Sequence, residues 1–182
     1  MAEFAVFLRG VNVGGITIRM AELRATLSAL PVSGVKTLLA SGNAVLSTDM
    51  DGATLKDRIE EALRAAFGYD AWVIVLARED LEALVRSCPY PSDDPDVHAY
   101  VTLSSDPAAL DRLVALLDAD GSSGTAEDGA HVRLGPVALA WRCPKGSTLD
   151  APLSKATAKP LFKATTTTRN LRTLQKVQAA FG

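Results

Sequence analysis

The sequence predicts an α+β protein in which a ferredoxin-like β-α-β-β-α-β unit is followed by a second, less regular α+β unit. Two observations predict this class. Apolar runs of strand length and apolar residues at helical spacing follow one another in that order over residues 1–77. A related strand–helix–hairpin order returns after residue 97. We therefore expect antiparallel sheets, each with its helices packed on one face.

The elements of the first half are assigned from periodicity and turn signals. Leu23 and Leu27 lie at helical spacing and predict an amphipathic helix. Ser41-Gly42-Asn43 predicts a hairpin turn, because Gly and Asn tolerate a positive φ. In chain order, the expected elements are a strand at 3–8, a helix at 19–30, strands at 35–40 and 44–47, a helix at 53–67 and a strand at 71–76.

A helix and a proline-rich linker are expected between the halves, and the second half then begins with a strand. Asp106 is expected to cap a helix that carries Pro107 in its first turn. The division is a first half at 1–77, a helix and linker at 78–97 and a second half at 98–182. The remaining elements are a helix at 79–87, a strand at 98–103, a break at 121–124, strands at 131–134 and 137–142, and helices at 152–159 and 168–180.

The composition is typical of a folded protein, since 48% of the 182 residues are hydrophobic and 22% are charged. The net charge of −2 argues against strong non-specific binding to nucleic acid, which needs many Lys and Arg contacts to phosphate. Cys88 and Cys143 are expected to be buried thiols of a reducing compartment. The sequence shows no secretory signal pattern and no apolar stretch of membrane length, so we expect a cytoplasmic protein with no membrane partner.

Strong catalytic motifs are missing from the sequence. It contains neither GxSxG nor HExxH, and its two histidines lack the spacing of zinc ligands. Asp93, Asp94 and Asp96 lie close together in the linker, but they lack the spacing of a calcium loop and are interpreted as solvated. We therefore expect no metal and no cofactor, and the sequence leaves open whether the protein is an enzyme.

The stretch FLRGVNVGG, residues 7–15, is the first candidate binding element. Its glycines follow a buried strand, and such a loop can present backbone N–H groups to an anion. It is not a P-loop, because Ile16 takes the place of the phosphate-binding lysine. The alternative is that the glycines only allow a tight turn and that the arginine forms an ordinary salt bridge. The candidate ligand-binding residues of this stretch are Arg9, Asn12, Gly14 and Gly15.

Two further motifs supply candidates. The Ser41-Gly42-Asn43 turn is expected near the end of the first strand, although a plain hairpin turn also explains it. The TTRN stretch at 167–170 is interpreted as a threonine-capped helix N-terminus beside an arginine, which would favour an anion. A cap with a solvent-facing arginine is the alternative. With one lysine from the basic segment before TTRN, these candidates are Ser41, Asn43, Lys155, Thr167, Arg169 and Asn170.

These motifs together resemble those of domain-of-unknown-function family 1697, a group of small bacterial proteins. The resemblance runs, in order, through FLRGVNVGG, Ser41-Gly42-Asn43, Pro144-Lys145-Gly146, Ser154-Lys155 and TTRN. It implies an α+β fold of ferredoxin-like units and no established reaction. The joint occurrence of the motifs favours one composite site over separate turns. The departures from the family pattern are Ala40, Cys143 and Leu171, which replace Gln, an aromatic residue and Trp.

The leading hypothesis is that the protein binds a small anionic or phosphorylated ligand in a cleft between its two halves. Arg9 and the glycine amides would form one wall, and Lys155 with Arg169 would form the other. An enzyme acting on a phosphorylated metabolite in the same cleft is the first alternative, with Lys155 as its titrating group if burial lowers the pKa of that side chain. A purely structural or interaction role is the second. Nucleic-acid binding is disfavoured, because only 5% of the residues are aromatic. The oligomeric state stays open.

Overall fold

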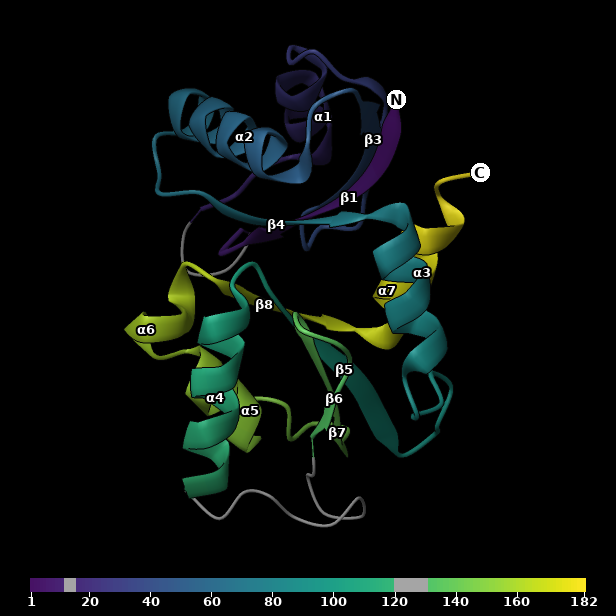
Figure 1. The fold of residues 1–182 in the computed structure, drawn as a ribbon, viewed down its shortest axis with the longest axis vertical. Helices are drawn as coiled ribbons and strands as arrows, with labels where there is room; N and C mark the ends of the chain where they lie inside the picture. Colours follow the sequence, from purple (N-terminus) through teal and green to yellow (C-terminus); the bar gives the residue numbers. More distant parts are fainter. Residues whose placement is uncertain (12–15, 120–130) are drawn as a thin grey trace. The chain divides into compact units, whose positions relative to one another are not determined.

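The computed structural model describes residues 1–11, 16–119 and 131–182, which form two compact units. The first unit comprises Met1–Ala83 with Gln175–Gly182, and the second comprises Leu84–Leu174 (Figure 1). Each unit has a four-stranded antiparallel sheet among its described residues. The predicted α+β class with antiparallel sheets is therefore confirmed. The predicted break at 121–124 lies outside the described residues.

The first unit has the β-α-β-β-α-β order that the periodicity predicted. Its strands lie in the order β2-β3-β1-β4, and all neighbouring strands are antiparallel. Figure 1 shows α1 and α2 on the same face of this sheet. The elements are β1 (Ala2–Arg9), α1 (Met20–Ser28), β2 (Ser33–Leu38), β3 (Asn43–Thr48), α2 (Gly52–Phe67) and β4 (Trp72–Ala77).

The core of the first unit lies between the sheet and these helices. Side chains alternate along a strand, so Val6 and Leu8 of β1 share one face of the sheet. They pack with Leu23 of α1 and Ile59 of α2, and all four are buried. Apolar residues at helical spacing form one face of α2, which is the face that the sequence assigned to the core.

Local sequence determines both ends of α2. The Asp51 carboxylate accepts hydrogen bonds from the backbone N–H and the hydroxyl of Thr54, each over 2.9 Å. These bonds, chiefly the one from the backbone, hold the pKa of Asp51 below its ordinary value. At the other end Gly68 has a φ of 66°, and its N–H donates to the Arg64 carbonyl over 2.9 Å.

The second unit is built on a sheet of strand order β6-β7-β5-β8. Leu110 and Leu113 of α4 and Leu153 of α5 pack with Trp141 of β7 to form its core. None of the helices within residues 1–11, 16–119 and 131–182 has the length and apolarity needed to cross a membrane. The remaining elements of the chain are α3 (Arg78–Ser87), β5 (Val97–Ser104), α4 (Pro107–Ala119), β6 (Val132–Arg133), β7 (Ala138–Pro144), α5 (Pro152–Thr157), α6 (Pro160–Lys163), β8 (Thr166–Asn170) and α7 (Leu171–Ala179).

The C-terminal region differs from the predicted helix at 168–180. Residues Thr166–Asn170 form β8, which pairs antiparallel with β5, and α7 begins only at Leu171. The β-branched threonines favour this extended conformation. Asn170 takes the capping role that the sequence assigned to threonine, because its Oδ1 accepts a hydrogen bond from the Arg172 N–H over 2.9 Å. Thr167 therefore lies inside a strand and does not start a helix.

Candidate functional site

The Ser41-Gly42-Asn43 turn packs against the end of β1 in the first unit. Asn43 is the register partner of Phe7, and the Leu8 N–H donates to the Gly42 carbonyl over 2.8 Å. Gly42 has a φ of 76°, and a Cβ added there would lie 2.6 Å from Cγ2 of Val11. A left-handed backbone and close packing therefore both require glycine at this position.

Asn43 is fully buried, and its amide closes the hairpin. Its Nδ2 donates to the Leu38 carbonyl over 2.9 Å and to the Ser41 hydroxyl over 3.0 Å. A buried amide needs such partners, since burial removes its bonds to water. These contacts give Ser41 and Asn43 a structural role in the turn. Their predicted contact with a ligand stays a prediction.

Arg9 is the last residue of β1 and is half-buried. Burial lowers the pKa of its guanidinium from the ordinary value, because the surrounding protein solvates the charge less well than water does. A cation in such a position gains more from a neighbouring anion than an exposed cation does. The other predicted residues of this stretch, Asn12, Gly14 and Gly15, lie outside the described residues.

The predicted residues of TTRN form hydrogen bonds with one another and with neighbouring elements. Arg169 is buried, and its Nη1 donates to the Thr167 hydroxyl over 2.7 Å and to the Thr168 carbonyl over 3.0 Å. The Thr168 hydroxyl lies 2.8 Å from that of Thr102 on β5. Asn170 caps α7. The predicted threonine cap is thus wrong, because pairing with β5 places these residues in the sheet, and the alternative of a solvent-facing arginine is wrong because Arg169 is buried. The predicted contact of these residues with an anion stays a prediction.

Lys155 lies on α5 with its side chain 65% exposed, and its Nζ is 3.9 Å from Oδ1 of Asp150. The hypothesis of a catalytic Lys155 required a buried side chain, and this exposure does not meet that requirement. The predicted cleft that would join Lys155 and Arg169 with Arg9 stays a prediction.

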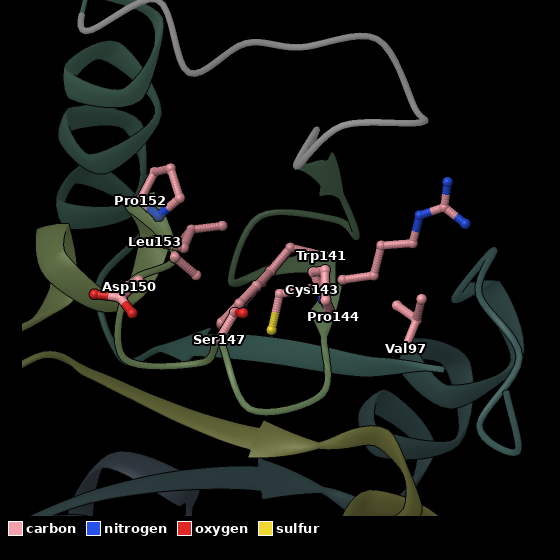
Figure 2. Close-up of a pocket in the computed structure, with 10 residues that line it drawn as sticks. Val97, Trp141, Cys143, Pro144, Ser147, Asp150, Pro152 and Leu153 are labelled. Atoms are coloured by element: carbon pink, nitrogen blue, oxygen red, sulfur yellow. The ribbon is translucent and has the colours of Figure 1, made fainter. Parts of the chain in front are cut away.

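A pocket of about 420 Å³ lies beside β7 in the second unit (Figure 2). Strand β7 contributes Trp141 and Cys143, and α5 contributes Leu153. Most of the lining side chains are apolar, which is typical of small-molecule sites. The remaining lining residues are Val97, Arg142, Pro144, Ser147, Asp150, Ala151 and Pro152.

The tryptophan wall of this pocket is held on two sides. The Trp141 Nε1–H donates to the Thr102 hydroxyl over 3.0 Å. Its indole ring stacks on Tyr100, with 4.8 Å between the centroids and 26° between the planes. Trp141 is only 2% exposed. The wall is therefore preformed, so a ligand would not have to order it.

The polar groups of the pocket come largely from the segment between β7 and α5. This segment carries Ser147 and Asp150, and Figure 2 shows the Ser147 hydroxyl and the Cys143 thiol lining the same part of the pocket. Arg142 also belongs to the lining, but its guanidinium carbon lies 5.5 Å from the centroid of the Tyr90 ring. Alternation along β7 places Arg142 on the opposite face of the sheet from Trp141.

Sequence reasoning missed Trp141, Ser147 and Leu153 as lining residues. Each lies in an element or next to a motif that the sequence did identify. The one available signal was the Pro144-Lys145-Gly146 turn, which begins the segment between β7 and α5. The pocket itself arises from the packing of α5 beside β7, which local periodicity does not encode.

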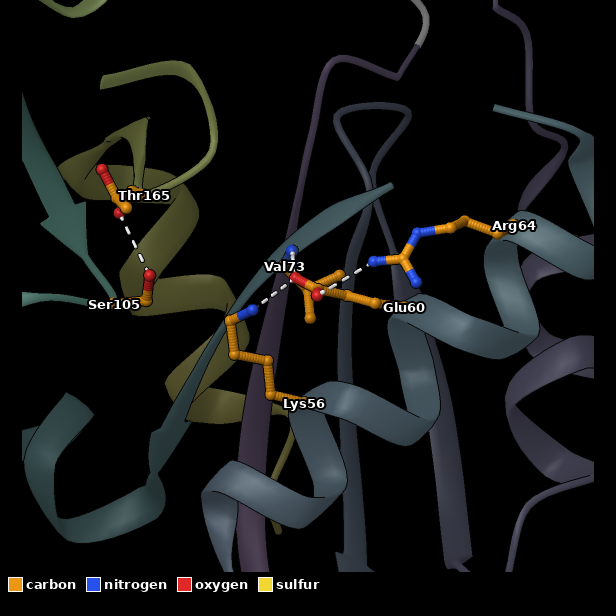
Figure 3. A network of polar contacts seen from close by, with 6 residues as sticks. All are labelled: Lys56, Glu60, Arg64, Val73, Ser105 and Thr165. Carbon is orange, nitrogen blue, oxygen red and sulfur yellow. Dashed lines mark hydrogen bonds and ion pairs between the residues drawn. The ribbon is translucent and has the colours of Figure 1, made fainter. Parts of the chain in front are cut away.

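A second polar cluster surrounds Glu60 in the first unit, and its contacts give it a structural role (Figure 3). The Glu60 carboxylate accepts bonds from the Val73 N–H over 3.0 Å, from Lys56 over 2.6 Å and from Arg64 over 3.5 Å. It is 7% exposed. The carboxylate thus ties α2 to the start of β4, and its acceptor positions are occupied by the chain itself.

The acidic linker is shaped by backbone bonds. Oδ1 of Asp94 accepts from the Asp96 N–H over 2.8 Å and from the Val97 N–H over 2.9 Å, and these bonds lower the pKa of Asp94. Within the described ranges of the chain, no three His, Cys, Asp or Glu side chains group closely enough to hold a metal ion. Asp94 therefore has a role in the turn before β5.

Comparison with known proteins connects the chain to a family and a fold. The model of the family described as "Protein of unknown function (DUF1697)" matches residues 1–130, which confirms the predicted family. The conserved bacterial protein SP0830 from Streptococcus pneumoniae has a solved structure with a TM-score of 0.78 and 21% identity, covering 100% of this chain and 99% of that one. This likeness shows the fold alone.

A second solved structure and the curated proteins show no further likeness to this chain. A solved structure of an unknown protein from Galdieria sulphuraria has 14% identity and covers 93% of this chain and 96% of that one, but its TM-score of 0.26 is too low to carry a conclusion. No curated protein matches the sequence.

Proposed function

We propose that this chain, which belongs to the DUF1697 family of proteins of unknown function, binds a small, largely apolar organic molecule in the pocket beside β7. The pocket itself is the observation that carries the proposal. Its volume of about 420 Å³ falls within the roughly 300–1,000 Å³ of small-molecule sites. Its tryptophan wall is fixed by a hydrogen bond and by ring stacking.

The lining indicates the chemistry of the ligand. Trp141 and Leu153 would cover an apolar ring or chain, and each Å² of apolar surface removed from water contributes about 25 cal/mol. The Ser147 hydroxyl is half-buried and forms no hydrogen bond with the described residues of the chain. A hydroxyl or carbonyl on the ligand would provide that partner. The proposed ligand is thus an apolar group with one neutral hydrogen-bonding group.

This function is tested with 4-nitrobenzyl alcohol, an aromatic ring that carries one hydroxyl and a nitro group that quenches indole fluorescence. The chain has two tryptophans, so Trp72→Phe leaves Trp141 as the reporter. We expect saturable quenching of Trp141. We expect 4-nitrotoluene, which lacks the hydroxyl, to bind about fivefold more weakly, the factor that one net hydrogen bond provides.

The two cysteines supply a matched control. Cys143 lines the pocket, whereas Cys88 is half-buried elsewhere in the unit. Cys143→Phe should fill the pocket and abolish the saturable quenching, while Cys88→Phe should leave it unchanged. Circular dichroism verifies that both variants are folded. Equal binding by the two variants would contradict the proposed site.

A second candidate function is binding of a small anion at Arg9 in the first unit. The observation that favours it is the half-buried guanidinium, whose pKa is lowered by burial. An adjacent phosphate or carboxylate would offset part of that loss of solvation, and arginine recognises both groups through two parallel hydrogen bonds. This proposal retains the anionic ligand that the sequence predicted, with Arg9 as its centre.

The anion proposal predicts that inorganic phosphate raises the Tm of the protein. A ligand at about 100 times its Kd stabilises by about 2.7 kcal/mol, roughly 5–10 °C for a chain of this size. Arg9→Met should remove the shift. Arg24→Met, which removes an exposed arginine of α1, should retain it. Loss of the shift in both variants would mean that phosphate acts through the general charge of the protein.

A further inference from the structure

We infer that Thr148, through its hydrogen bond to Tyr100, positions the polar wall of the pocket. The inference rests on the proposed function of this pocket, because it concerns how the same site is held ready. The polar wall is the segment 145–151, which connects β7 to α5 and carries Ser147 and Asp150.

Short-range bonds shape the segment, and they reach no farther into the sheet than Pro144, the last residue of β7. The Ser147 N–H donates to the Pro144 carbonyl over 3.1 Å. The Ser147 carbonyl accepts from the N–H groups of Asp150 over 3.1 Å and Ala151 over 3.2 Å. These bonds join residues at most four positions apart. They define turns, and they leave the position of those turns over β7 to other contacts.

Thr148 makes the side-chain contact that reaches the sheet from this part of the segment. Its Oγ1 lies 3.0 Å from the Tyr100 hydroxyl of β5, within hydrogen-bond distance, and 3.8 Å from the Cys143 thiol. The start of the segment is fastened separately, since the Lys145 N–H donates to the Asp96 carbonyl over 3.0 Å. Thr148 is the residue next to Ser147, so this bond also restricts the backbone from which the Ser147 side chain projects.

Tyr100, to which Thr148 is hydrogen-bonded, is itself held in place by its neighbours. The Tyr100 ring stacks on Trp141, the Trp141 indole donates to Thr102, and the Thr102 hydroxyl lies 2.8 Å from that of Thr168. This series of contacts crosses β7, β5 and β8. The tryptophan wall and the polar wall of the pocket therefore share one support, and Tyr100 is the side chain that joins them.

Removal of the Tyr100 or the Thr148 hydroxyl releases the polar wall and leaves the tryptophan wall in place. Tyr100→Phe keeps the aromatic stack on Trp141 and deletes only the bond to Thr148. Thr148→Val keeps the shape of the side chain and deletes this bond from the other side, together with the weak hydrogen bond that the Cys143 thiol donates to the Thr148 hydroxyl. Thr148→Ser retains a hydroxyl and serves as the conservative control. In each variant the apolar wall remains, so a change in binding reports on the position of the segment.

The experiment uses the Trp72→Phe chain and two readouts. The first is the affinity for 4-nitrobenzyl alcohol, which we expect Tyr100→Phe and Thr148→Val each to lower about fivefold, with no further loss in the double variant. The second is acrylamide quenching of Trp141 without any ligand, which both variants should increase. Thr148→Ser should match the parent in both readouts.

The outcomes distinguish this inference from the proposed function. If the parent chain binds no probe, the proposed function fails, and acrylamide quenching still decides whether the segment is held by this bond. Unchanged quenching in Thr148→Val would overturn the inference even if the parent binds the probe. A Thr148→Ser variant as impaired as Thr148→Val would also overturn it, because the hydroxyl would then not be the group that matters.

Discussion

Gly42→Ala is expected to destabilise the first unit by about 2–4 kcal/mol, which combines the strain of a left-handed non-glycine residue with the overpacking of a filled core. Gly42 has a φ of 76°, and an added Cβ would lie 2.6 Å from Cγ2 of Val11 and 3.0 Å from Cβ of Leu8. Both neighbours are buried and have little room to move. Thermal unfolding should show a Tm lower by roughly 5–15 °C.

Gly68→Ala is the matched control for this prediction. Gly68 has a φ of 66°, but no described atom lies within 4 Å of the Cβ that would be added. It therefore suffers the backbone strain alone, about 1–2 kcal/mol. If the two variants lost equal stability, close packing of the turn on β1 would not be the reason for glycine at 42.

Glu60→Ala is expected to lower the free energy of unfolding by about 2–3 kcal/mol, largely through the donor that it leaves buried. Val73 is fully buried, and its N–H donates to the Glu60 carboxylate over 3.0 Å. The side chains of Lys56 and Arg64 are 25% and 48% exposed, so hydration of these cations compensates for much of the ion pairing that the variant removes. Urea titration followed by circular dichroism measures the change.

Two variants test this explanation. Glu61→Ala removes the neighbouring carboxylate, which is 72% exposed and 3.8 Å from Arg58, and should change stability by at most about 0.5 kcal/mol. Glu60→Gln keeps an acceptor for the Val73 N–H and should lose less than Glu60→Ala. A Glu60→Gln variant as unstable as Glu60→Ala would show that charge pairing, rather than the buried hydrogen bond, is the main contribution.

The predictions from sequence succeeded where the signal was local. Leu23 and Leu27 identified α1 by spacing alone, and the helix predicted at 53–67 agrees with α2 (Gly52–Phe67) to within one residue. The hairpin at Ser41-Gly42-Asn43 was recognisable because Gly and Asn tolerate its backbone. Each of these features depends on contacts between near neighbours in the chain.

The TTRN stretch shows where local reasoning fails. Threonine is suitable both as a helix cap and as a strand residue, so the sequence of the stretch does not distinguish the two. The choice is made by pairing with β5, in which Arg169 is the partner of Val101 and Thr167 that of Leu103. This pairing joins distant parts of the chain, and it places the threonines that were expected to cap a helix inside a sheet.

The sequence by itself determined the order of elements in the first unit, the α+β class and the family, because periodicity, turn residues and motifs are properties of short segments. Only the tertiary structure decided which side chains form a pocket. Val97 comes from β5, Trp141 from β7 and Leu153 from α5, and Ser147 lies in the segment between β7 and α5. They meet because α5 packs on the core beside Trp141. The hydrophobic effect that drives this packing is non-directional, so a sequence pattern does not indicate which elements will pack together.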